Sequence, residues 1–112
     1  MTGISTHILD TGNGHPAAGV PVYLEQQQPS GWVPVGEGTT NDDGRVTSLA
    51  SDTENLEPGT YRLQFAVKTY FDRQSTTCFY PEVTVVFEVS DDRHHHIPLL
   101  LSTYGYSTYR GS

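Results

Sequence analysis

Turn residues interrupt this chain so often that long helices have little room to form. Glycine occurs 11 times and proline 7 times in 112 residues. Thr, Val and Ile, whose branched side chains favour strands, together make up 27 of the 112 residues. Short strands separated by turns about every 8 to 12 residues are typical of a sandwich of two β-sheets. The seven or eight predicted strands are 5–9, 20–25, 32–37, 45–49, 61–67, 82–89, 94–101 and 104–109.

Hydrophobic patterning describes some of these segments more closely. Tyr, Leu, Phe and Val alternate with other residues along 61–67, which predicts a strand with one buried face. Residues 68–75 break that period and are expected to hold one short helix. Segment 82–89 is almost continuously apolar, a pattern typical of a strand buried on both faces. Pro21 restricts its strand to a sheet edge or makes the proline the start of the strand.

The chain has the size of one small domain, 1–112. Val, Ile, Leu and Phe account for only 25 of the 112 residues, which is low for a domain that must bury a core. Either the monomer therefore has only a thin core, or additional apolar surface is buried at a subunit interface. The net charge is −7, and Lys68 and five scattered arginines are the only basic residues besides histidine. This balance argues against nucleic acid as a partner.

No segment predicts a membrane span or a secretory signal. The longest apolar run, 97–101, has five residues including a proline, whereas a span needs about 18 or more. The first seven residues have neither the basic region nor the apolar region of a signal peptide. Cys78 is the only cysteine, so no internal disulfide is possible. The aromatic residues that follow it, at 79 and 80, indicate a packed thiol. We therefore expect a cytoplasmic protein that binds no membrane.

Three consecutive histidines stand at 94–96. A strand period of two places His94 and His96 on one face and His95 on the other. Two imidazoles at this spacing can share a metal ion, and His7 is a candidate third ligand if its strand pairs nearby. The alternative is a solvated or partly buried histidine run at the start of a strand. The pattern alone leaves both interpretations open.

Two further features carry chemically useful side chains. Arg45 follows the tight turn predicted at 41–44. Either the turn holds its guanidinium group in place to donate paired hydrogen bonds, or Arg45 is a surface residue that closes a hairpin. The C-terminal tetrapeptide 109–112 brings together an aromatic ring, a guanidinium group, a hydroxyl and the carboxylate. The sequence contains no glycine-rich phosphate loop and no serine nucleophile elbow.

Motifs in four regions resemble one known family over essentially the whole chain. They are Leu9-Asp-Thr-Gly12 with 15–22, then 79–87, 94–102 and 109–112. Together they resemble the transthyretin-like proteins. The tetrapeptide Tyr-Arg-Gly-Ser at 109–112 resembles the sequence that marks the enzyme branch, 5-hydroxyisourate hydrolase, apart from the vertebrate hormone carrier. Thr103 departs from the family, which usually has proline at this turn position.

The resemblance implies an all-β fold, a sandwich of two four-stranded sheets with one short helix. It also implies a homotetramer, a dimer of dimers, with active sites at the dimer–dimer interface. The channel there would be lined by the first strand, the strand of His96 and the C-terminal strand.

The implied reaction is hydrolysis of 5-hydroxyisourate to 2-oxo-4-hydroxy-4-carboxy-5-ureidoimidazoline, a step of urate degradation, with neither metal nor cofactor. His7 and His96 would position and deprotonate water, Arg45 would stabilise the oxyanion, and the hydroxyl of Ser112 would hydrogen-bond water or substrate. The expected catalytic residues are His7, Arg45, His96 and Ser112, and the expected substrate-binding residues are His7, Arg45, Tyr109, Arg110, Gly111 and Ser112.

Two other function classes compete with this hydrolase. One is a transthyretin-like channel that binds small amphipathic aromatic ligands without catalysis, and it would need a smooth apolar pocket. The polar side chains of His7, His96 and Arg45 argue against such a pocket. The other is an extracellular sandwich domain for adhesion or carbohydrate binding, against which the expected absence of a signal peptide and disulfides counts.

Overall fold

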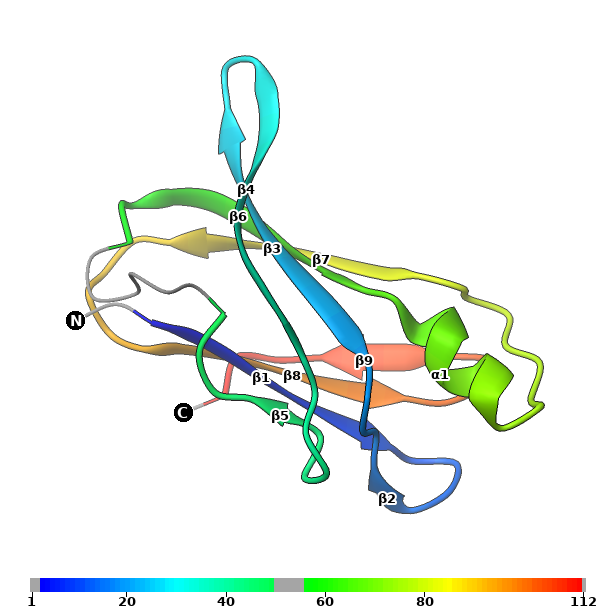
Figure 1. Ribbon diagram of the computed structural model, residues 1–112. Helices are drawn as coiled ribbons and strands as arrows, with labels where there is room; N and C mark the ends of the chain where they lie inside the picture. Colours follow the sequence, from blue (N-terminus) through cyan, green and yellow to red (C-terminus); the bar gives the residue numbers. More distant parts are fainter. Residues whose placement is uncertain (1–2, 50–55, 112) are drawn as a thin grey trace.

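In the computed structural model, which describes residues 3–49 and 56–111, two β-sheets face each other across one core and the helix lies at one end (Figure 1). The predicted all-β sandwich with one short helix is confirmed. The elements are β1 (Ile4–Asp10), β2 (His15–Pro16), β3 (Pro21–Gln28), β4 (Gly31–Thr39), β5 (Arg45–Val46), β6 (Gly59–Phe65), α1 (Val67–Arg73), β7 (Val83–Val89), β8 (His95–Leu101) and β9 (Tyr106–Thr108).

One sheet runs β4-β3-β6-β7, and the other runs β2-β1-β8-β9 with β5 also paired to β1. The second sheet therefore has five strands where four were expected. The difference arises because two strands of two residues each share one edge of β1. There β5 pairs with Thr6 and His7, and β2 pairs with Leu9 and Asp10.

The parallel pairing of β1 with β8 decides which side chains meet. Ser5 lies opposite His96 and His7 opposite Pro98, although about 90 residues separate each pair in the sequence. On β8 the buried side chains of His95, Ile97 and Leu99 alternate with the outward ones, as the period of two predicted. The outward side chains of β1, β5 and β8 therefore share one face of the sheet.

The inner faces of both sheets form the core. Tyr61, Leu63 and Phe65 of β6 are almost completely buried, which confirms the predicted alternation as far as Phe65, where the strand ends before the predicted 67. The helix spans Val67–Arg73, close to the predicted 68–75, and buries Val67, Tyr70 and Phe71. No helix in residues 3–49 and 56–111 is long and apolar enough to cross a membrane.

The carboxylate of Asp10 ties the end of β1 to the helix. Asp10 is buried and accepts hydrogen bonds from the backbone N–H groups of Gly12 and Asn13, both at 3.1 Å. It also accepts one from the Tyr70 hydroxyl at 2.7 Å. These contacts explain the Leu-Asp-Thr-Gly motif as a turn closed by a buried, fully partnered carboxylate.

The prediction that 82–89 is buried on both faces is wrong. In β7, Thr84, Val86 and Glu88 are exposed, and Val86 has 57% of its surface accessible. The physical reason is topological, because β7 forms the edge of its sheet and the described part of the chain places nothing over its outer face. By contrast, Pro21 does begin β3, and Cys78 packs against the core as expected.

The turn at Thr103 is closed by hydrogen bonds in place of the proline that the family usually has there. The Thr103 carbonyl accepts the N–H of Phe79 at 2.8 Å. The Gly105 carbonyl accepts both the N–H and the hydroxyl of Ser102, at 2.9 and 3.1 Å. These bonds hold the connection between β8 and β9.

Candidate active site

The outer face of β5, β1 and β8 brings together three of the side chains expected from the sequence. His7 is the register partner of Arg45 on one side and of Pro98 on the other. His96 lies on the same strand as Pro98, two residues earlier and on the same face. This arrangement gives the face two imidazoles and one guanidinium group.

A tight turn presents Arg45. The side-chain oxygen of Asn41 accepts the N–H groups of Asp43 and Arg45 at 2.9 and 3.0 Å, as the predicted turn requires. Gly44 has φ +75, and a Cβ there would lie 2.5 Å from the carbonyl oxygen of Ile8. The turn therefore needs glycine for its conformation and for its close approach to β1. Arg45 itself is exposed and forms no ion pair with any described residue.

An open pocket of about 440 Å³ lies on this face. Arg45, His96 and Ser5 line it, together with Thr6, Val46, Thr47 and His94. Three separate segments therefore face one hollow, with a guanidinium group from the first, imidazoles from the second and hydroxyls from the third. Such a hollow suits a small, flat, polar ligand that offers carbonyl oxygens.

His96 is held as a neutral imidazole. Its partial burial lowers its pKa from the ordinary value, and the positive charge of Arg45 lowers it further, followed by His7 and His94. A neutral imidazole at neutral pH can accept a proton, so His96 suits the role of a general base.

Sequence reasoning missed the contact that links His94 to His96. The Ser5 hydroxyl oxygen lies 2.7 Å from Nε2 of His94 and 2.8 Å from Nδ1 of His96. The sequence showed that Ser5 shares a face with His7, but the position of Ser5 opposite His96 follows only from the parallel register of β1 and β8. For the metal alternative, no group of three or more histidine, cysteine or acidic side chains in residues 3–49 and 56–111 is placed to hold an ion.

The C-terminal segment packs directly on His96. The N–H of Gly111 donates to the His96 carbonyl at 2.8 Å, and a Cβ on Gly111 would lie 2.5 Å from Cδ2 of the imidazole. Only glycine fits there. Ser112, the fourth residue of the tetrapeptide, lies outside the described residues.

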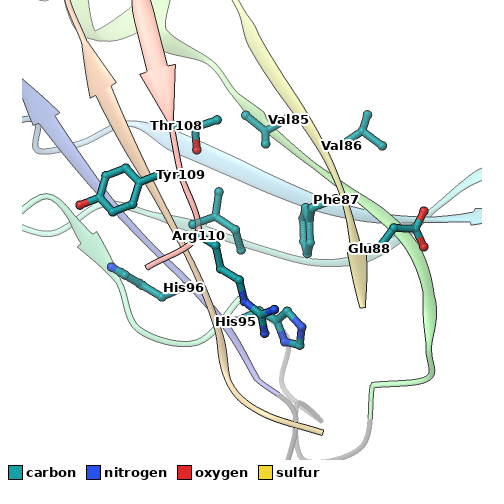
Figure 2. A pocket seen from close by; sticks show the side chains of 10 residues that line it. Val85, Val86, Phe87, Glu88, His95, His96, Thr108, Tyr109 and Arg110 are labelled. Atoms are coloured by element: carbon teal, nitrogen blue, oxygen red, sulfur yellow. The ribbon is translucent and has the colours of Figure 1, made fainter. Parts of the chain in front are cut away.

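Tyr109 and Arg110 line a different cavity, of about 320 Å³, between β7 and the strands β8 and β9. Its walls include Val85, Phe87 and Ile97, and His96 borders both this cavity and the open pocket. Figure 2 shows Arg110 extending toward His95 and away from the outer face. Its Nη2 lies 3.6 Å from Oδ2 of Asp91. The C-terminal segment therefore reaches the site through the contact of Gly111 with His96, whereas the Arg110 side chain lines the other cavity.

His95 occupies the inner side of the same strand and is 3% exposed. Neither ring nitrogen has a hydrogen-bond partner among the residues that the structure describes, and Oδ1 of Asp91 is 3.7 Å from Nε2. Burial lowers the pKa of His95 from its ordinary value and the charge of Arg110 adds to this, whereas Asp91 opposes it. His95 is therefore a neutral, unsatisfied group next to the cavity.

Comparison with known proteins places this geometry in a family. The model of the HIUase/Transthyretin family matches residues 4–111. A 5-hydroxyisourate hydrolase from Salmonella typhimurium is 46% identical over 110 residues, which cover 97% of this chain and 80% of the relative. The structure of Klebsiella pneumoniae 5-hydroxyisourate hydrolase superposes with a TM-score of 0.87 at 33% identity, covering 98% of this chain and 99% of that one.

A transthyretin superposes equally well. Sea bream transthyretin in complex with thyroxine has a TM-score of 0.88 at 31% identity and covers 96% of this chain and 93% of its own. The shared fold alone therefore does not separate the two kinds of protein. The family model, the sequence identity and the fold agree with one another, and the chain belongs to the HIUase/Transthyretin family.

Proposed function

We propose that this protein is a 5-hydroxyisourate hydrolase that forms 2-oxo-4-hydroxy-4-carboxy-5-ureidoimidazoline in urate degradation. The observation that carries the proposal is that His96 and Arg45 line one open pocket, where burial and the charge of Arg45 lower the pKa of His96 and Arg45 has no ion-pair partner among the described residues. Relatives at 46% identity bear the name of this hydrolase. A polar, cationic pocket also suits a flat oxopurine-like ring better than an apolar ligand.

In the proposed reaction, water is the only co-substrate. An imidazole, of His96 or His7, takes one proton from water while the oxygen bonds to a ring amide carbonyl carbon. The carbonyl electron pair moves onto its oxygen, where Arg45 stabilises the negative charge. The intermediate then collapses, the C–N bond breaks, and the imidazole returns its proton to the leaving nitrogen.

The remaining members of the site orient the substrate. His7 lies opposite Arg45 and would hydrogen-bond the ring from the adjacent strand. Gly111 allows the C-terminal segment to pack on His96. The hydroxyl of Ser112, which lies outside the described residues, would hydrogen-bond water or substrate. Tyr109 and Arg110 line the neighbouring cavity, which His96 also borders, so their backbone would support the site from behind His96. One positioned base contributes roughly 10²–10⁴ in rate and one oxyanion donor about 10²–10³, so these groups suffice for an activated substrate.

We further propose a homotetramer, a dimer of dimers, whose dimer–dimer channel is lined by this outer face. The low apolar content is consistent with burial at interfaces. The edge strands β7 and β9 leave Val86 and Tyr106 exposed, at 57% and 42%. Unpaired edges of this kind need cover. The single cysteine is consistent with a cytoplasmic location.

The test generates 5-hydroxyisourate with urate oxidase and follows its absorbance with added protein. Wild type should accelerate the decay, and His7→Ala, Arg45→Ala and His96→Ala should each slow it about 10²-fold or more while the tetramer persists. Near wild-type rates in all three variants would refute the site. A channel carrier predicts instead tight thyroxine binding without hydrolysis. Dilution that dissociates the tetramer should abolish activity, and a fully active monomer would refute the proposed assembly.

A further inference from the structure

The Ser5 hydroxyl lies between two imidazoles and touches both. Its oxygen is 2.7 Å from Nε2 of His94 and 2.8 Å from Nδ1 of His96, and Ser5 is only 8% exposed. The contact is built into the fold, because the parallel pairing of β1 with β8 sets Ser5 directly opposite His96. His94 precedes β8 and reaches Ser5 from the exposed side of the strand.

A hydroxyl carries one proton, so it can donate to only one of the two nitrogens. When the hydroxyl donates to one nitrogen, the other nitrogen must carry a proton and donate it to the serine oxygen for both contacts to be hydrogen bonds. In the first arrangement His96 Nδ1–H donates to Ser5, and Ser5 donates to His94. In the second, the direction of both bonds is reversed. The two arrangements give His96 opposite tautomers, with Nε2 unprotonated in the first and protonated in the second.

The charge of Arg45 favours the first arrangement. Arg45 lines the same pocket as His96 and acts on it strongly enough to lower the pKa of His96. A guanidinium group offers only N–H donors, so a lone pair on Nε2 is favourable beside it and another N–H is not. The hydrogen bond to Ser5 occupies Nδ1. Nε2 is therefore the nitrogen of His96 left to act on a ligand.

We propose that Ser5 and His94 hold His96 in its Nδ1–H tautomer, so that Nε2 is the proton acceptor of the site. Ser5 and His94 are positioning residues, and their catalytic consequence rests on the function proposed above. Protons balance without any transfer along the chain of hydrogen bonds. Nε2 gains one proton from water and later gives it to the leaving nitrogen, while Nδ1–H donates to Ser5 and Ser5 donates to His94 throughout.

Two substitutions of His94 test whether the hydrogen-bond acceptor that it offers to Ser5 is what matters, and not the size of its side chain. His94 is exposed, so neither change threatens the fold. Leucine in His94→Leu offers no acceptor, so the Ser5 hydroxyl should turn to Nδ1 of His96 and move the imidazole proton to Nε2. Glutamine in His94→Gln retains an acceptor oxygen and should preserve the wild-type tautomer. His15→Leu is the matched control, because His15 is exposed and bonds only to the Pro16 carbonyl within the described residues.

The primary readout is the ¹⁵N NMR spectrum of histidine-labelled protein, with the His96 signals assigned by their loss in His96→Gln. Wild type, His94→Gln and His15→Leu should show Nδ1 protonated, and His94→Leu should show Nε2 protonated. In the hydrolysis assay, kcat should fall about tenfold or more in His94→Leu and stay within about threefold in His94→Gln, with KM nearly unchanged in both.

A double-mutant experiment removes the Ser5 hydroxyl, which connects His94 to His96. Ser5→Ala should lower kcat as His94→Leu does, and adding His94→Leu to Ser5→Ala should have no further effect. Protonated Nε2 in the wild type would overturn the proposal. So would a His94→Leu variant with an unchanged tautomer or an unchanged kcat. Because the NMR measurement needs no substrate, it decides the tautomer even if the wild type fails to hydrolyse 5-hydroxyisourate.

Discussion

Gly111 and His96 are in such close contact that no side chain fits between them. The N–H of Gly111 donates to the carbonyl of His96 at 2.8 Å, and a Cβ on Gly111 would lie 2.5 Å from Cδ2 of the imidazole. Gly111 is therefore held against β8, the strand that carries the candidate base. In this way the C-terminal tetrapeptide forms part of the site although its arginine faces elsewhere.

Gly111→Ala should displace either the His96 ring or the C-terminal segment. We expect kcat to fall about 10²-fold, because a shift of about 1 Å in a positioned group costs that much, while the melting temperature changes little. Gly105→Ala is the control, since its Cβ would meet nothing closer than the Ser102 hydroxyl at 3.7 Å. Steady-state kinetics of both variants check the prediction, and equal activity in the two would contradict it.

Arg45→Gln should change the pH dependence of hydrolysis as well as its rate. The Arg45 charge lowers the pKa of His96, so its removal should raise that pKa. Activity that needs neutral His96 is lost as pH falls through this pKa, so the acid limb of the kcat/KM profile should move to higher pH. Arg93→Gln removes the same charge from an exposed position. This control variant should leave the acid limb of the kcat/KM profile at its wild-type pH. An acid limb that does not move in Arg45→Gln would contradict the account.

His95→Phe should stabilise the protein. It removes two buried nitrogens that have no hydrogen-bond partner among the described residues, each the kind of group that costs about 1–3 kcal/mol, and the adjacent cavity gives the larger ring room. After the cost of repacking we expect a gain of about 1 kcal/mol in the free energy of unfolding, measured by urea denaturation at pH 7.

The same substitution should flatten the pH dependence of stability. Burial lowers the pKa of His95, so below its ordinary value of about 6.5 the unfolded chain binds a proton that the folded chain does not. Stability is therefore lost as pH falls through this window. His95→Phe should make that loss less steep. Some loss of stability at low pH should remain, because the pKa of His96 is also lowered in the folded protein. A steeper loss in the variant would contradict this.

Gly44→Ala should be far more damaging than Gly14→Ala. Both glycines have φ near +75, but a Cβ at Gly44 would lie 2.5 Å from the Ile8 carbonyl oxygen, whereas Gly14 has nothing within 4 Å. We expect a loss of about 1 kcal/mol for Gly14→Ala and about 3 kcal/mol or more for Gly44→Ala. Thermal denaturation measures both. Activity should fall only in Gly44→Ala, because that turn presents Arg45, and similar losses in stability would contradict the argument.

Local patterns in the sequence predicted much of this structure. The period of two separated His95 from His94 and His96, and the Asn41–Gly44 segment predicted the turn before Arg45. These features depend on neighbouring residues alone. The spacing of strands and turns predicted the sandwich, the break in period at 68–75 predicted the single helix, and the whole-chain resemblance implied the same fold, with which the family model over residues 4–111 agrees.

What the sequence did not reveal depends on contacts between distant segments. The position of Ser5 between His94 and His96 follows from the parallel register of β1 and β8, which no local pattern encodes. An apolar run such as 82–89 suggests burial on both faces, but only the topology shows that β7 is an edge strand. The closeness of Gly111 to His96 likewise appears only in three dimensions.

The most direct test is multiple-turnover decay of 5-hydroxyisourate at substoichiometric protein. The account predicts a decay rate that rises in proportion to the concentration of wild-type protein, with each active site consuming many substrate molecules. A variant carrying His7→Ala, Arg45→Ala and His96→Ala together should decay at the spontaneous rate. A wild-type protein that leaves the spontaneous rate unchanged, or that merely sequesters one equivalent of 5-hydroxyisourate per site, would contradict the central claim.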